Sequence, residues 1–178
     1  EEESWMTSAA NMNRQHFVFE KSIRLNVANE TLTAHKILVK YAVRNAKAEI
    51  LREAEQMVEV RALSAVWLDK IELPDIDCFE EYVSYEAWED GKCIGASSVI
   101  FSYHKYFHYQ DPKLRRARVE GNEIIVSAEA YAKSVEILNE NEDMVLEDNY
   151  FDMNAGEKRV RIISGEPVGL KVRSVYDI

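Results

Sequence analysis

Closely spaced carboxylates are the residues whose types and spacing could support chemistry in this sequence. They form three groups: Glu80 with Glu81, Glu89 with Asp90, and Glu140 with Glu142. Cleavage of a glycosidic bond uses two carboxyl groups that face one another across the bond, about 5–5.5 Å apart in retaining enzymes. Neighbouring residues of a strand point to opposite faces, so the first two groups cannot converge on one bond. We therefore interpret all three groups as solvated charge and predict no catalytic residue.

Two patterns in the sequence resemble metal sites, but neither has the required spacing and geometry. His104 and His108 have i, i+4 spacing, but this spacing brings two rings together only on a helix, and their segment is extended or irregular. Asp148, Asn149 and Asp152 lack the spacing and the bidentate Glu of a calcium loop, and we interpret them as turn formers. No nucleophile elbow, zinc-protease motif, Cys-x-x-Cys, phosphate loop or dinucleotide fingerprint occurs. We predict neither a metal site nor a cofactor.

Aromatic residues provide the candidate binding surface. Trp88 shares one face of its expected strand with Tyr82, Ser84 and Glu86, which is the more polar face. We predict Trp88 and Tyr82 as a carbohydrate-binding platform, because sugars stack on exposed aromatic rings. A domain interface and a Trp at a sheet edge are the two other interpretations of the same pattern.

The elements that must carry these residues are β-strands. Apolar and polar residues alternate in about seven segments between Ser22 and Phe101. The stretch 49–56 has helical propensity, yet strands flank it, so we predict a strand there as well. Further strands are expected at 113–119, 123–130, 133–138, 144–146, 158–163 and 170–175. The fold class is therefore all-β, with two β-sandwich domains in tandem.

The domain boundary is expected near Asp111-Pro112. Proline disfavours helical backbone at the residue before it, and the segment interrupts the strand pattern. We divide the chain into a linker over residues 1–19, a sandwich over 20–110 and a second sandwich over 111–178. The crossover before the boundary is aromatic, and we expect its rings to pack between the two domains. These rings belong to Tyr103, Tyr106, Phe107 and Tyr109.

Charge and composition exclude several function classes. The chain has 178 residues and a formal net charge of −10, which disfavours nucleic acids and anionic membranes as partners. No apolar run reaches about 18 residues, so no transmembrane helix is predicted. A hairpin at Asp90-Gly91 would set Cys93 opposite Trp88 and leave Cys78 about 33 Å away. We predict free thiols and a cytoplasmic, reducing location, and we interpret the sequon at Asn29 as a strand-end turn.

Several segments together resemble one family. They are EKSIRLNVANET at 20–31, ALSAVWLDKIEL at 62–73, the hairpin at 82–101, KYFHYQDP at 105–112, VEGNEIIVSAEAYAKSVEI at 119–137, and DNYFD at 148–152 followed by GE and an alternating strand. In this order they resemble the C-terminal domains of family 2 glycoside hydrolases of the β-mannosidase type. Those domains are a mannosidase Ig/carbohydrate-binding-module-like domain and a terminal Ig-fold domain, so the resemblance implies two tandem immunoglobulin-like β-sandwich domains.

The resemblance implies a non-catalytic accessory region within a longer enzyme that hydrolyses terminal β-mannose with retention. The catalytic glutamates of that family lie at barrel strand ends in an upstream domain, and no position of this chain matches their motifs. The implied partner is the catalytic barrel, and residues 1–13 would be the exit from it. The region would stabilise the barrel, and it could wall one side of the substrate cleft or mediate assembly. Exposed sandwich edges would also allow a homo-oligomer.

A second interpretation belongs to a different functional class. The same two sandwiches could form a free-standing carbohydrate-binding module or an adhesin-like Ig tandem. The feature that separates the two is the upstream sequence, since a catalytic barrel directly before this chain favours the accessory region, and a signal peptide there favours the adhesin.

Overall fold

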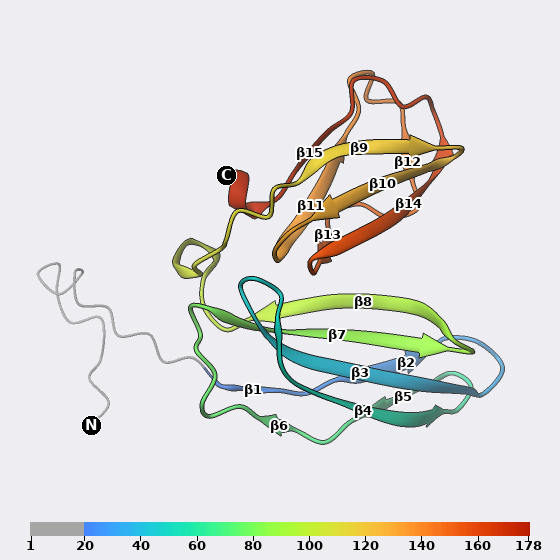
Figure 1. Cartoon of the computed structure of the whole chain (residues 1–178). Helices are drawn as coiled ribbons and strands as arrows, with labels where there is room; N and C mark the ends of the chain where they lie inside the picture. The colour runs from blue at the N-terminus through green and yellow to red at the C-terminus, as the bar shows by residue number, and fades with distance from the viewer. Residues whose placement is uncertain (1–19) are drawn as a thin grey trace, which may run out of the picture.

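A four-stranded antiparallel sheet forms the larger layer of the N-terminal half of the molecule (Figure 1). The computed structural model describes residues 20–178, apart from the side chains at 115–117, so the predicted linker over 1–19 lies outside the described residues. The sheet order is β4 (Ile50–Val60), β3 (His35–Asn45), β7 (Glu81–Glu89) and β8 (Lys92–Ile100). The opposite layer pairs β2 (Asn26–Asn29) with β5 (Ser64–Trp67), and β1 (Ser22–Ile23) with β6 (Ile71–Glu72).

The core between these layers follows from the period-2 alternation of the strands. Ile37, Val39 and Val43 of β3 are buried, whereas Lys36 is exposed and Lys40 half-buried. Burying one such aliphatic side chain contributes about 1.5–3 kcal/mol, so the alternation determines which face turns inward. The predicted strand at 49–56 is confirmed as part of β4, because every residue from Arg52 to Val60 pairs with β3 despite its helical propensity.

The C-terminal half is a second sandwich. Its four-stranded layer has the order β12 (Val145–Leu146), β14 (Gly156–Ser164), β10 (Glu123–Ala128) and β9 (Arg115–Glu120). Its three-stranded layer has the order β13 (Phe151–Met153), β11 (Ala132–Leu138) and β15 (Lys171–Arg173). Two short 3-10 helices complete the described chain, η2 (His104–Tyr106) in the crossover and η3 (Val175–Asp177) at the end. The prediction of two tandem β-sandwiches is confirmed.

The structure shows the pairing of Trp88, the state of the two cysteines and the environment of Asn29. Trp88 pairs with Cys93 as predicted, and Cys78 and Cys93 are both free. The Asn29 side chain is buried, and its amide donates to the carbonyls of Thr33, Val60 and Arg61, which confirms the strand-end turn. Within residues 20–178, no helix is long and apolar enough to cross a bilayer.

The two sandwiches are joined by a buried charge network centred on Asp152. Its carboxylate accepts hydrogen bonds from Ser98 Oγ at 2.6 Å and Ser98 N–H at 3.0 Å, across the interface. From its own sandwich it accepts bonds from Lys133 Nζ at 2.6 Å and Ser134 N–H at 3.0 Å. The sequence prediction of a turn-forming role for Asp152 was therefore wrong, because these donors come from β11 of its own sandwich and from β8 of the neighbouring one.

An aromatic cluster adjoins this network. Tyr131 stacks on Tyr82 with ring centroids 3.7 Å apart, and its hydroxyl lies 2.6 Å from Ser98 Oγ. Phe107 is buried against both rings, as predicted for the crossover, whereas Tyr103 is largely exposed. The tip of the β3–β4 hairpin also reaches the C-terminal sandwich, where Ala46 accepts a backbone hydrogen bond from Tyr131 (Figure 1).

Replacing Asp152 by Ala tests the charge network. The Lys133 ammonium would remain almost buried without its carboxylate, so we expect a loss of about 3–5 kcal/mol in the free energy of unfolding. The measurement is urea unfolding at neutral pH. The matched control is Asp148→Ala, which removes a more exposed ion pair with Lys158 and should cost less than about 1 kcal/mol. Equal losses in both variants would contradict the role of Asp152.

Acid should weaken the same network. Burial raises the pKa of the Asp152 carboxyl, but Lys133, Ser98 and Ser134 together hold the pKa below its ordinary value. Its contribution to stability is therefore fully present above the unfolded-state pKa of about 3.9 and is lost as pH falls through the folded-state pKa. We expect the stability difference between wild type and Asp152→Asn to be large at neutral pH and to shrink below about pH 4. Urea titrations across this range measure it, and a constant difference would contradict the prediction.

Candidate binding groove on the outer face of the four-stranded sheet

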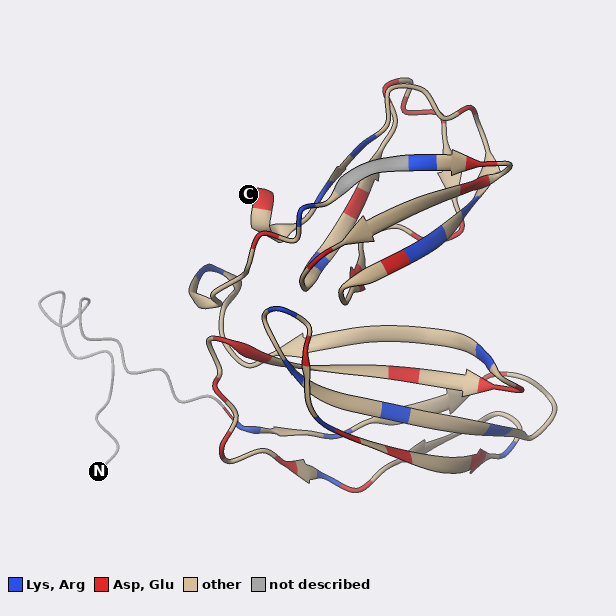
Figure 2. Ribbon diagram, viewed as in Figure 1, with Lys and Arg blue, Asp and Glu red and all other residues tan. Residues whose placement is uncertain are grey.

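Pairing in the four-stranded sheet arranges its outer face into rows of different chemistry. The apolar row is Met57, Leu38, Trp88 and Cys93, and the next row is Glu55, Lys40, Glu86 and Ala96. Glu53, Ala42, Ser84 and Ser98 form the third row, and the fourth contains Arg44, Tyr82 and Ile100. In Figure 2 the cationic residues of β3 lie between acidic residues of β4 and β7. The second row is thus mainly charged, and the third row consists of small residues apart from Glu53.

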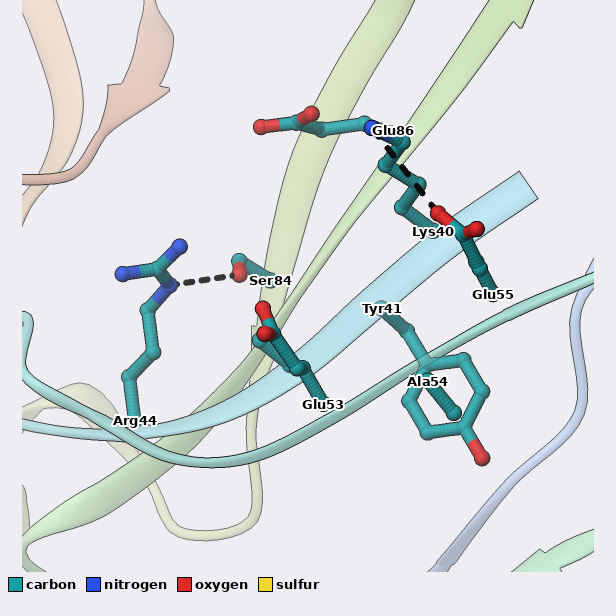
Figure 3. Close-up of a pocket in the computed structure, with 9 residues that line it drawn as sticks. Lys40, Tyr41, Arg44, Glu53, Ala54, Glu55, Ser84 and Glu86 are labelled. Carbon is teal, nitrogen blue, oxygen red and sulfur yellow. Dashed lines mark hydrogen bonds and ion pairs between the residues drawn. The ribbon is translucent and has the colours of Figure 1, made fainter. Parts of the chain in front are cut away.

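A groove of about 370 Å³ opens over the charged and small rows. Its polar lining comes from three neighbouring strands: Lys40 and Arg44 on β3, Glu53 and Glu55 on β4, and Ser84 and Glu86 on β7. We call this depression the outer-face groove (Figure 3). Its volume lies within the range of small-molecule sites in proteins, about 300–1,000 Å³.

Hydrogen bonds hold two of the groove side chains in place. Arg44 donates from Nε to Ser84 Oγ at 2.9 Å and from Nη1 to the Ala48 carbonyl at 2.8 Å. Glu86 accepts a 2.7 Å hydrogen bond from the Trp88 indole N–H. The Lys40 ammonium lies 3.9 Å from Glu55 Oε2, which is the separation of a loose ion pair. The groove is thus lined by both donors and acceptors on a hydrogen-bonded sheet.

The predicted sugar platform does not form, because Tyr82 and Trp88 lie in different environments. Tyr82 has no exposed surface, stacks on Tyr131, and donates from its hydroxyl to Asn154 Oδ1. Burial raises the pKa of the Tyr82 hydroxyl. Tyr82 therefore follows the interpretation as a domain-interface residue, and its ring cannot stack on a ligand.

Trp88 lies six residues further along β7, roughly 20 Å from Tyr82. It is half-buried, and the Lys40 ammonium lies 5.0 Å from the centre of its ring. A sugar could reach that part of the ring only if Lys40 moved away. Ser84 and Glu86, which line the groove, thus lie between the two predicted platform residues on β7.

The other candidate clusters of the sequence are dispersed. His104 bonds to the Tyr109 hydroxyl at 2.8 Å, and His108 lies 3.3 Å from Glu80. Glu89 lies 2.5 Å from the His35 ring. Among residues 20–178, no group of three or more His, Cys, Asp and Glu side chains could hold a metal ion.

The groove itself was not predicted from the sequence. The alternation in β3 did place Lys40 and Arg44 on its polar face, opposite Val39 and Val43. The pairing partners on β4 and β7 depend on the register of three strands, which the periodicity of a single strand does not contain. Pairing of Lys40 with both Glu55 and Glu86 is what assembles the charged row.

Two known domain families match nearly all of the described region. Residues 21–106 match the family described as the mannosidase Ig/CBM-like domain, and residues 109–178 match an Ig-fold domain family of the mannosidase type. No curated protein sequence matches the chain.

Solved structures show the same fold. The β-D-mannosidase from Dictyoglomus thermophilum aligns with a TM-score of 0.69 and 18% identity over 86% of this chain and 20% of its own. An exo-chitosanase from Amycolatopsis orientalis aligns with a TM-score of 0.52 and 11% identity over 85% of this chain and 25% of its own. This chain thus spans only a fifth to a quarter of either protein. The two family matches show that the chain belongs to the mannosidase-type immunoglobulin-like domains, because residues 21–106 match a mannosidase Ig/CBM-like domain and residues 109–178 an Ig-fold domain.

Proposed function

We propose that this chain is the non-catalytic accessory region of a longer glycosidase of the β-mannosidase type, within glycoside hydrolase family 2. The observation that carries the proposal is the tandem order of the two family matches, which accounts for nearly all of residues 21–178. A β-D-mannosidase contains the same pair of folds as one fifth of its length. The longer protein would hydrolyse terminal β-mannose residues, and its catalytic barrel would be the partner of this region.

The docking of the two sandwiches supports a mechanical role. The Asp152 network and the Tyr82–Tyr131 stack join the sandwiches through buried groups, so the pair can act as one rigid unit. A rigid unit that packs against a catalytic domain stabilises it, since any contact made only in the folded state shifts the unfolding equilibrium. In this proposal the region stabilises the barrel and contributes one wall beside the substrate cleft.

We also propose that the protein works in a reducing compartment such as the cytoplasm. The support is the pair of free thiols, Cys78 in the core and Cys93 on the surface. Exposed thiols persist unpaired where glutathione and thioredoxin keep them reduced.

The accessory role predicts a division of activity between this chain and the complete gene product. We expect no release of p-nitrophenol from p-nitrophenyl β-mannoside by the 178-residue chain alone, and retaining hydrolysis by the complete protein. The Asp152→Ala change in the complete protein should shorten its half-life on heating while leaving initial turnover close to wild type, because this carboxylate holds the accessory sandwiches together. Turnover by the isolated chain, or a complete protein inactive on β-mannosides, would contradict the proposal.

A further inference from the structure

We propose that the outer-face groove binds a saccharide, with Ser84 and Glu86 on one side, Glu53 on the other and Arg44 between them. The inference deepens the proposed function, because it assigns a ligand class to a site on the accessory region. It rests on that function only for the choice of test sugars. The site differs from the platform expected from the aromatic residues, because Tyr82 is buried and Lys40 lies over the ring of Trp88.

The groups in the groove fit a ligand rich in hydroxyls. Each sugar hydroxyl both donates and accepts a hydrogen bond, so a pyranose is matched by carboxylates next to cationic donors. Glu53 on β4 and Glu86 on β7 provide acceptors on either side of β3, and Arg44 on β3 provides the donor between them. Ser84 accepts from Arg44 Nε at 2.9 Å and keeps its own proton to donate.

Other ligand classes fit this lining less well. The groove contains three carboxylates, Glu53, Glu55 and Glu86, against Lys40 and Arg44, so phosphates and other anions meet net negative charge. A metal ion is not favoured either, because among residues 20–178 no group of three or more His, Cys, Asp and Glu side chains could hold one. An apolar ligand would desolvate charged walls without providing hydrogen bonds in return. A neutral ligand with several hydroxyls can donate hydrogen bonds to the carboxylates and accept hydrogen bonds from Lys40 and Arg44 at the same time.

The groove is also organised before a ligand arrives. Arg44 is tied to Ser84 and to the Ala48 carbonyl, which limits the rotamer freedom that a ligand would otherwise have to remove. Ser84 is 7% exposed and lies on the central strand pair of the sheet. At its far end the groove meets the second sandwich, where Ser84 and Glu86 also line a small crevice with Asp152 and Asn154. An extended saccharide can therefore lie along the sheet with one end against that sandwich.

The experiment is an NMR titration of the ¹⁵N-labelled 178-residue chain with β-1,4-mannobiose and β-1,4-mannotriose. We expect saturable shifts, with millimolar affinity, at the backbone amides of Ala42, Ser84 and Glu86. The double variant Glu53→Ala, Glu86→Ala should weaken binding by at least about tenfold. Glu59→Ala is the matched control, because Glu59 lies on the same face of β4 beyond the groove and should not change the affinity.

Each outcome has a defined meaning. Groove-centred shifts that weaken in the double variant and persist in Glu59→Ala and Trp88→Ala support the proposal, provided the spectra show that every variant is folded. Absence of saturable shifts with either sugar overturns it, as does binding that Trp88→Ala abolishes and the double variant retains. The result is independent of the β-mannoside assay, since that activity is assigned to the catalytic barrel and would persist even if the groove bound nothing.

Discussion

The Asp152 carboxylate lies between the two sandwiches and is satisfied only when they are docked. Ser98 of one sandwich and Lys133 with Ser134 of the other converge on its two oxygens. Burial of a charge is costly, several kcal/mol per ion, unless good geometry and additional hydrogen bonds offset it. Undocking would remove the Ser98 donors and leave the carboxylate with fewer hydrogen-bond donors than it has in the docked state. The relative orientation of the sandwiches therefore depends on charge satisfaction as well as on apolar contact.

The aromatic cluster beside this network restricts the relative orientation of the two sandwiches. Tyr82 and Tyr131 stack at 3.7 Å, and Tyr131 also contacts Ser98 through its hydroxyl and Ala46 through its backbone N–H. A stacked pair tolerates sliding, whereas hydrogen bonds at both ends of one tyrosine do not. Tyr131 thus joins the hairpin tip, the edge of β8 and the Asp152 network into a single interface. Phe107 of the crossover is buried in the same cluster and covers that interface.

The sequence predicted the strands well because each strand is determined locally. Alternation in β3 and β7 requires only that one face be apolar, and β4 became a strand through pairing with β3, against its own propensity. The interface and the groove depend on information that no single segment contains. Tyr82 occupies the polar face of β7 in the sequence pattern, yet it is buried because a second domain covers that end of the sheet. Asp152 resembles a turn former for the same reason, since its partners lie on β8 and β11.

Arg44 connects the groove to the docking of the domains. Its Nε–H holds Ser84 in the groove, while its Nη1–H holds the Ala48 carbonyl in the hairpin tip that contacts Tyr131. Any movement that separates the hairpin tip from the second sandwich would pull on a side chain that lines the groove. The coupling also runs in the other direction, because linkage is reciprocal: a ligand that binds Arg44 in this position must stabilise the docked arrangement by the amount that docking improves its affinity. In a longer enzyme, the same connection would let contacts on one sandwich influence a site on the other without any rearrangement of the sheets.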